Sequence, residues 1–142
     1  MDRSARRLGT VLGLWLGAIM LCPPLSAQSA RPLKAIGTTA VGTPVFLEPG
    51  SVSRKGTVVT AAVRVRLQPP LKHPNGDLRS SRTIAMYDCA RQTVATKESW
   101  YYHDDDGRKE GMHRVVKTPG FGPAFKGSLA AVAMMHLCTS AR

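Results

Sequence analysis

The sequence lacks the residue patterns that usually mark an enzyme or a metalloprotein. Only three of its 142 residues are cysteines, and no two of them have the CxxC spacing of a redox or zinc site. No GxSxG segment indicates a nucleophilic serine, and the four histidines lie far apart in the sequence. We therefore expect a protein without a catalytic residue, a cofactor or a bound metal ion.

Acidic residues and long apolar runs are scarce as well. The chain has 9 acidic and 20 basic residues, which gives a formal net charge of +11. The longest apolar run, residues 8–21, has about 14 residues, whereas a helix that spans a bilayer needs roughly 20. The run is therefore too short for a permanent membrane anchor.

The beginning of the chain has the layout of a secretory signal peptide. Residues 1–7 are basic, the apolar run follows them, and Ala27 offers a small side chain at which cleavage can occur. We expect cleavage near Ala27 and export to the periplasm or the cell surface. A lipid on Cys22 is the alternative, and it would hold the domain on a membrane. It is disfavoured because Leu21 is larger than the residue that lipoprotein processing favours before the cysteine.

Removal of the signal peptide, residues 1–27, leaves one small basic domain. It has 142 − 27 = 115 residues and a net charge of +9. We expect residues 28–43 to form an arm or an edge strand and residues 44–142 to form the domain proper. An excess of positive charge favours anionic partners such as lipid head groups, sulfated glycans or acidic proteins, although it also simply keeps a protein soluble. Export would separate the protein from nucleic acid, so no physiological nucleic-acid partner is expected.

Cleavage would leave Cys89 and Cys138 as an even pair of cysteines in an oxidising compartment. A disulfide between them is the natural inference. It would close a loop of 49 residues and stabilise the fold by about 4 kcal/mol. The alternative is two free cysteines that serve a metal ion or catalysis, and no Cys/His spacing supports it.

Most of the mature chain shows the alternation of an antiparallel β-sheet. In residues 57–67 apolar side chains alternate with polar ones, which is typical of a strand with one buried and one solvated face. The residues expected on the buried face are Val59, Ala61, Val63, Val65 and Leu67. Further strands are expected at residues 44–48, 83–89, 93–103 and 112–116, with a short edge strand at residues 33–36.

The end of the chain predicts a helix. Residues 129–138 are rich in helix-forming residues, and Ser128 can cap their N-terminus. Helical spacing places Ala131, Met134, Met135 and Cys138 on one face, which we expect to pack on the sheet. The predicted fold class is therefore α+β, an antiparallel β-sheet with a C-terminal helix held by a disulfide.

Exposed cations and one aromatic side chain are the candidates for binding a partner. Residues 68–82 are predicted to form the most basic exposed loop of the mature chain, and we expect Trp100 and Tyr102 in the core. The Asp104–Asp106 tract is interpreted as a turn because it lacks the spacing of a calcium loop. Solvated arginines without a partner are the simpler alternative. The predicted contact residues are Arg64, Arg66, Lys72, Arg79, Arg82 and Tyr101.

Several short motifs resemble the surface-adhesin protein E family of Gram-negative bacteria. These are Ser80-Ser81-Arg82, the YDCA motif at residues 87–90, the pair Tyr101-Tyr102, and Cys138 in a terminal helix. The similarity covers roughly residues 45–138. It implies an antiparallel sheet with a disulfide-held helix, an extracytoplasmic location, and binding of host extracellular-matrix proteins.

Three functions are compatible with these observations. The first is a non-catalytic exported binding protein, whose partner is a protein or an anionic glycan. The second is a structural or envelope-stress protein whose sheet edge pairs with another copy to form a homodimer. The third is a small hydrolase or an enzyme inhibitor, for which no sequence motif is present.

Overall fold

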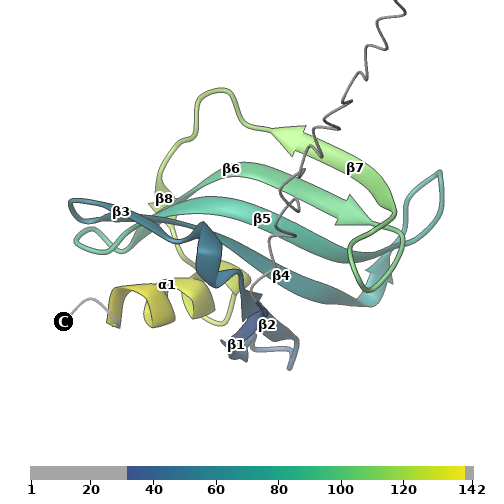
Figure 1. Cartoon of the computed structure of the whole chain (residues 1–142), viewed down its shortest axis with the longest axis horizontal. Coiled ribbons are helices and arrows are strands. Elements are labelled where there is room, and N and C mark those ends of the chain that lie inside the picture. Colours follow the sequence, from purple (N-terminus) through teal and green to yellow (C-terminus); the bar gives the residue numbers. More distant parts are fainter. Residues whose placement is uncertain (1–31, 140–142) are drawn as a thin grey trace, which may run out of the picture.

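Two long strands form the centre of an antiparallel sheet (Figure 1). The computed structural model describes residues 32–139, and in it β4 (Val58–Leu71) pairs with β5 (Leu78–Asp88). The complete order of the path is β1-β2-β4-β5-β6-β7, with β3 beside β4 and β8 beside β6. The other strands are β1 (Lys34–Thr38), β2 (Pro44–Leu47), β3 (Ser53–Lys55), β6 (Thr93–Tyr102), β7 (Glu110–Val115) and β8 (Gly122–Pro123).

One helix, α1 (Leu129–Thr139), packs against one face of this curled sheet (Figure 1). The Ser128 hydroxyl accepts a hydrogen bond from the Ala131 amide at 3.2 Å, so the predicted N-cap is confirmed. At the other end, the Arg54 guanidinium donates to the Leu137 carbonyl at 2.6 Å. This bond satisfies a carbonyl that the helix itself leaves without a partner, and it ties β3 to the helix.

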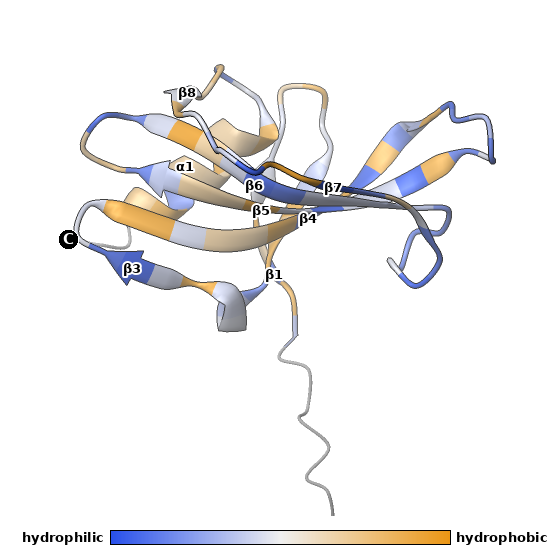
Figure 2. Cartoon of the chain, turned by 90° about the horizontal axis from the view of Figure 1, so that it is seen from above, coloured by the Kyte–Doolittle hydropathy of each residue, from blue (hydrophilic) through white to orange (hydrophobic). Residues whose placement is uncertain are grey.

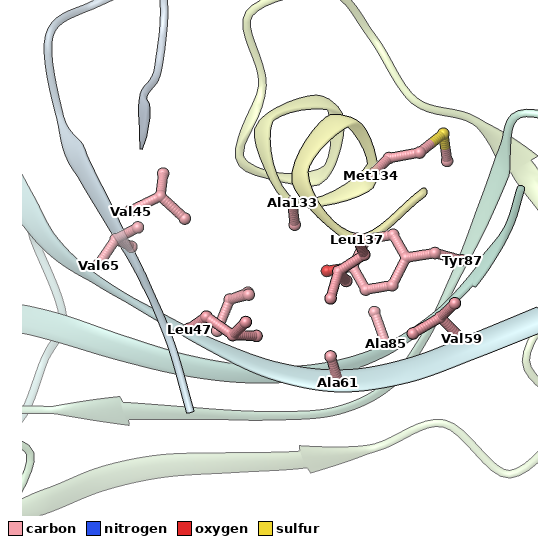
Figure 3. Packing of buried hydrophobic residues seen from close by; sticks show 11 residues of the cluster. Val45, Leu47, Val59, Ala61, Val65, Ala85, Tyr87, Ala133, Met134 and Leu137 are labelled. Atoms are coloured by element: carbon pink, nitrogen blue, oxygen red, sulfur yellow. The ribbon is translucent and has the colours of Figure 1, made fainter. Parts of the chain in front are cut away.

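The hydrophobic core lies between the helix and the inner face of the sheet (Figure 3). The alternation predicted for residues 57–67 is confirmed, because its apolar side chains point to the helix and the arginines do not. Burial of Tyr87 under the helix raises the pKa of its phenol. The fully or largely buried residues of the cluster are Val45, Leu47, Val59, Ala61, Val63, Val65, Ala85, Tyr87, Ala133, Met134 and Leu137.

The predicted disulfide is present. Cys89 follows the end of β5, and Cys138 lies in the last turn of α1, with 5.4 Å between their Cα atoms. The α+β fold class, with a C-terminal helix held to the sheet by this bond, is therefore confirmed.

The predicted helix face was wrong in part. Met134 is buried as expected, but Met135 is 69% exposed, and Ala133 and Leu137 contact the sheet instead. The helix is apolar on nearly every side, so hydrophobic spacing alone could not select the buried face.

The predicted loop at residues 68–82 was also wrong. β4 continues to Leu71 and β5 begins at Leu78, so only a short turn separates the two strands. The prolines in this part of β4 are tolerated because the pairing of β4 with β5 is irregular between Arg66 and Leu71. Arg79 and Arg82 therefore lie on a strand rather than in a loop.

The expected signal peptide, residues 1–27 with Cys22, lies outside the described residues. Of the expected arm, residues 28–43, the later part contains the edge strand β1. No helix within residues 32–139 is both long enough and apolar enough to cross a membrane.

Candidate functional site

The outer face of the sheet carries a row of side chains that runs across four strands. Arg64 of β4 is paired in register with Arg82 of β5, which is paired with Trp100 of β6, which is paired with His113 of β7. Paired residues on neighbouring strands point to the same face, so these four side chains form one continuous row. The row lies on the face opposite to the helix.

Glu48 holds the two arginines of this row. Its carboxylate accepts hydrogen bonds from Arg64 at 2.5 Å and from two guanidinium nitrogens of Arg82 at 2.8 Å each. Burial alone would raise the pKa of Glu48, but the hydrogen bonds from Arg82 and Arg64 outweigh it and lower the pKa below its usual range. The same carboxylate raises the pKa of Arg82. Two of the predicted contact residues are therefore already ion-paired within the protein.

The aromatic side chain of the row is stacked rather than buried. The Arg82 guanidinium lies 4.8 Å from the centre of the Trp100 ring, and the His113 ring stacks on Trp100 at 4.6 Å with an angle of 10°. Glu98 lies 3.4 Å from His113 at the end of this stack. The expectation of a core position is wrong for Trp100, which is half-buried on the outer face, and right for Tyr102, which is buried.

At one end of the sheet, the turn between β4 and β5 and the turn between β6 and β7 come together. We call this region, residues 72–80 and 103–110, the hairpin end. The Ser80 hydroxyl donates to the Asp104 carbonyl at 2.6 Å, and a ring nitrogen of His103 lies 3.1 Å from the Asp77 carbonyl. Figure 2 shows that these turns are strongly hydrophilic. Lys72 pairs with Asp77 at 2.7 Å, and both side chains are accessible.

The hairpin end is not a basic patch, because acidic residues surround its cations. It has four basic side chains and five acidic ones, whereas the remainder of residues 32–139 has eleven basic and three acidic side chains. The sequence predicts a basic loop around Lys72 and Arg79, because the acidic residues 104–106 that lie beside it are distant in sequence. The acidic residues of the hairpin end are Asp77, Asp104, Asp105, Asp106 and Glu110.

The Asp104–Asp106 tract is a turn, as expected. The Asp104 carboxylate accepts hydrogen bonds from the amides of Lys109 and Arg108 at 3.0 Å. The hydrogen bond from Lys109, together with the one from Arg108, lowers the pKa of Asp104. Among the described residues, no group of three or more histidine, cysteine, aspartate or glutamate side chains could hold a metal ion.

A basic region lies at the end of the sheet opposite to the hairpin end, next to the C-terminus of the helix. The Cys89 amide donates to the Thr57 carbonyl at 3.0 Å, which brings the turn after β3 to the turn after β5 (Figure 1). We call the cations on these two turns and their flanks the helix-end site. The Asp88 carboxylate accepts from the amides of Ala90 and Arg91, and it lies 3.9 Å from the Arg91 guanidinium. The residues of the helix-end site are Arg54, Lys55 and Arg91.

The remaining predicted contacts lie elsewhere. Arg66 is exposed on the outer face of β4, two residues beyond Arg64, whereas Tyr101 is half-buried on the inner face, on the same side as the helix. The six predicted residues thus occupy three places: Arg64, Arg66 and Arg82 lie on the outer face, Lys72 and Arg79 at the hairpin end, and Tyr101 on the inner face. Sequence reasoning missed Glu48, which organises the outer row from 16 and 34 residues away, and it missed the helix-end site, whose members are scattered in sequence.

Comparison with known proteins gives a consistent result. The sequence model described as surface-adhesin protein E matches residues 34–139. Crystal form II of Haemophilus influenzae protein E superimposes with a TM-score of 0.55 and 16% identity, over 87% of this chain and 98% of that chain. A second structure of the same protein has a TM-score of 0.51 and 15% identity, over 84% and 92%. At this identity the superpositions show a shared fold, and no curated sequence matches the chain significantly.

Proposed function

Because this chain belongs to the surface-adhesin protein E family, we propose that it is an exported, non-catalytic protein that binds an anionic component of the extracellular matrix. Family membership supports an adhesin-like surface protein. The basic and apolar layout of residues 1–27 supports export.

The main support for an anionic partner is the uneven distribution of charge over the protein. Outside the hairpin end, eleven basic side chains face only three acidic ones within residues 32–139. Glu48 and Asp88, two of these three, already serve internal contacts. Most of the surface therefore attracts anions, and such a field steers a negatively charged partner toward the protein.

We place the main contact at the helix-end site rather than at the predicted loop. Arg91 is 81% exposed, and Lys55 is exposed in the adjoining turn. Arg66 and Tyr101 remain candidate contacts because their polar groups have no hydrogen bond or ion pair within residues 32–139. Arg64 and Arg82 act indirectly, since Glu48 already holds them.

Heparin, a sulfated glycan, is a suitable probe of this proposal. The oxidised mature protein should bind immobilised heparin, and its affinity should fall steeply as salt rises. The double variant Lys55→Glu/Arg91→Glu should lower the affinity about tenfold or more, because it places negative charge at the contact.

The matched control carries the same change of charge at the other end of the sheet. Lys72→Glu/Arg79→Glu alters two exposed cations of the hairpin end and should have a much smaller effect. Equal losses in the two double variants would show that only total charge matters. Binding that does not change with salt would exclude an electrostatic contact altogether.

Self-association is a second candidate function, supported by the free edge of β7. This strand is the last in the sheet order, and its Val115 is 59% exposed. An unpaired strand edge can pair with a second copy of the chain. Sedimentation at several concentrations should show a dimer that Val115→Lys weakens; a monomer at all concentrations would reject this candidate.

A further inference from the structure

The sheet has a second free edge, on the side opposite to β7. β1 is the first strand of the sheet order and pairs with β2 alone, so its other edge has no partner strand within residues 32–139. Such an edge presents a row of backbone N–H and C=O groups. The five residues of β1 span about 16 Å. Backbone groups in this arrangement pair with another extended backbone.

The helix turns this edge into a groove. α1 packs on β1, β2 and β4 rather than on β7, and a hollow of about 420 Å³ lies between α1 and β1 (Figure 1). We call this hollow the edge groove. Three successive residues of β1 line it, Ile36, Gly37 and Thr38. Successive side chains of a strand point to opposite faces, so a hollow that all three line runs along the edge of the strand.

α1 supplies the second wall of the edge groove as one stripe of side chains. The stripe follows helical spacing and consists of Val132, Met135, His136 and Thr139. Met135 is 69% exposed, whereas the neighbouring Met134 is buried in the core. An exposed methionine can adapt its shape to different apolar side chains. The groove therefore places an adaptable apolar wall opposite a free strand edge.

The strand and the helix approach each other closely at Gly37. A Cβ atom at this position would lie 2.9 Å from the Cγ1 atom of Val132, and the residue has a φ of +150°. Glycine therefore allows β1 to lie against the helix. The register of β1 with β2 skips the preceding residue, Ile36. The extra residue of such a bulge is left out of the ladder, so Ile36 has no partner residue in β2 and lines the groove.

A single cation sets the charge beside the edge groove. Lys34 is exposed and makes no ion pair within residues 32–139. Its register partner Leu47 is buried under the helix, so Lys34 points to the helix side of β1. Burial, followed by the positive charge of Lys34, lowers the pKa of His136, which shows that Lys34 lies close to the groove.

No carboxylate opposes this cation. Among the described residues, no aspartate or glutamate lines the edge groove. Glu48, which follows β2, is already held by two arginines of the outer row. The groove therefore favours a partner that carries negative charge as well as an apolar side chain.

We propose that the edge groove binds an extended, acidic peptide segment of a partner protein. The segment adds a strand to the free edge of β1, one of its apolar side chains contacts Met135, and an acidic side chain lies near Lys34. This mode of binding requires a peptide backbone, which a sulfated glycan lacks. The site is therefore independent of the heparin-binding contact proposed above.

Fluorescence anisotropy with a labelled peptide tests the proposal on the oxidised mature protein. The probe is a heptapeptide that alternates valine with glutamate, and it should bind saturably at one site per chain. The same peptide with N-methylated backbone amides should bind at least about tenfold more weakly, because it cannot pair with a strand. A heptapeptide that alternates valine with lysine should also bind more weakly than the glutamate probe.

Two substitutions of exposed apolar side chains localise the peptide. Met135→Glu places a carboxylate in the edge groove and should weaken binding of the glutamate probe about tenfold or more. Val115→Glu makes the same change on β7, at the other edge of the sheet, and should leave the affinity unchanged. Both side chains are more than half exposed, so neither substitution should alter the urea midpoint.

A reversed charge on β1 tests the preference for an acidic peptide. Lys34→Glu should weaken binding of the glutamate probe about tenfold and strengthen binding of the lysine probe, because the charge beside the groove is reversed. Lys72→Glu alters an exposed cation of the hairpin end, and it is the control. It should change the two affinities much less.

Three results with the peptides would overturn the proposal. They are the absence of saturable binding by both probes, equal affinity for the methylated and unmethylated peptides, and equal weakening by Met135→Glu and Val115→Glu. Sedimentation supplies a fourth. A dimer that Met135→Glu converts to a monomer would mean that a second copy of the chain, and not a partner peptide, fills the edge groove.

Discussion

The two ends of the sheet are stabilised by different interactions. At the end that α1 covers, apolar side chains, a disulfide and the Arg54 bond to Leu137 hold the helix against the strands. At the hairpin end the two turns are joined by polar contacts, among them the bond from the Ser80 hydroxyl to the Asp104 carbonyl. Leu78 is the one large aliphatic side chain of residues 72–80 that is fully buried.

This difference predicts unequal local stability. Regions with few buried apolar contacts open at lower free energy than a packed core. The hairpin end should therefore open while the helix remains on the sheet. The substitutions below test this expectation, from the largest effect to the smallest.

Loss of the disulfide should have the largest effect. Replacement of Cys89 and Cys138 by alanine removes a link across 49 residues, and it should lower the free energy of unfolding by about 4 kcal/mol. Urea unfolding of the double variant and of the oxidised wild type measures the difference. Thiol-reduced wild type is the control and should match the variant. A loss below about 1 kcal/mol would mean that packing alone holds the helix.

Truncation of one buried leucine at each end compares the two regions directly. Leu137→Ala should lower the free energy of unfolding by about 3 kcal/mol, because it opens a cavity between the helix and the sheet. Leu78→Ala should cost about 2 kcal/mol, since the turns around it can collapse into the space. Urea unfolding measures both variants. A larger loss for Leu78→Ala would contradict the predicted order of local stability.

The outer row lies between these regions and depends on a single carboxylate. Glu48→Ala leaves two half-buried arginines without their partner and should lower the free energy of unfolding by about 2 kcal/mol at pH 7. Glu98→Ala is the matched control, because the carboxylate of Glu98 lies 3.4 Å from His113 and has no ion pair to an arginine within residues 32–139, and it should have a small effect.

The effect of Glu48 should also depend on pH. Its pKa is lower in the folded protein than in the unfolded chain. Its contribution is therefore fully present above the unfolded value, about 4.3, and is lost as the pH falls through the lower folded value. The difference between wild type and Glu48→Ala should shrink on acidification. A constant difference from pH 7 to pH 3 would show that the carboxylate acts by packing rather than by charge.

Local patterns predicted the strands and the disulfide well. The alternation in residues 57–67 identifies both faces of β4, because one face packs on the helix while the arginines of the other do not. The disulfide between Cys89 and Cys138 is predicted because export places the protein in an oxidising compartment and cleavage of the signal peptide leaves two cysteines. The faces of a strand depend on residues that are neighbours in sequence, and the disulfide depends on the number of cysteines, so both can be predicted from the sequence.

Contacts between distant segments could not be predicted in this way. The prolines and Asn75-Gly76 that precede Arg82 predict an exposed loop, yet Arg82 lies on β5 and pairs with Glu48, 34 residues away. Likewise, the acidic turn at residues 104–106 lies beside the turn between β4 and β5 only because the two hairpins pack together. Sequence alone showed the charges without showing which of them meet.

The smallest predicted effect tests whether the hairpin end behaves independently. Asp104 is solvent-accessible, and its carboxylate accepts bonds from the amides of Lys109 and Arg108. Asp104→Asn should leave the urea midpoint unchanged but should speed hydrogen exchange of these two amides severalfold, because the charged acceptor is lost. Asp106→Asn, in the same turn, is the control and should leave the exchange unchanged.

Acid should reproduce the effect of Asp104→Asn in the wild type. The pKa of Asp104 is lowered in the folded protein, so its stabilisation of the turn is present above the ordinary aspartate value, about 3.9, and is lost as the pH falls through the lower folded value. Relative to the variant, the protection of the Lys109 amide should disappear in that range. If Asp104→Asn instead lowered the global free energy of unfolding as much as Glu48→Ala does, the two ends of the sheet would unfold as one unit.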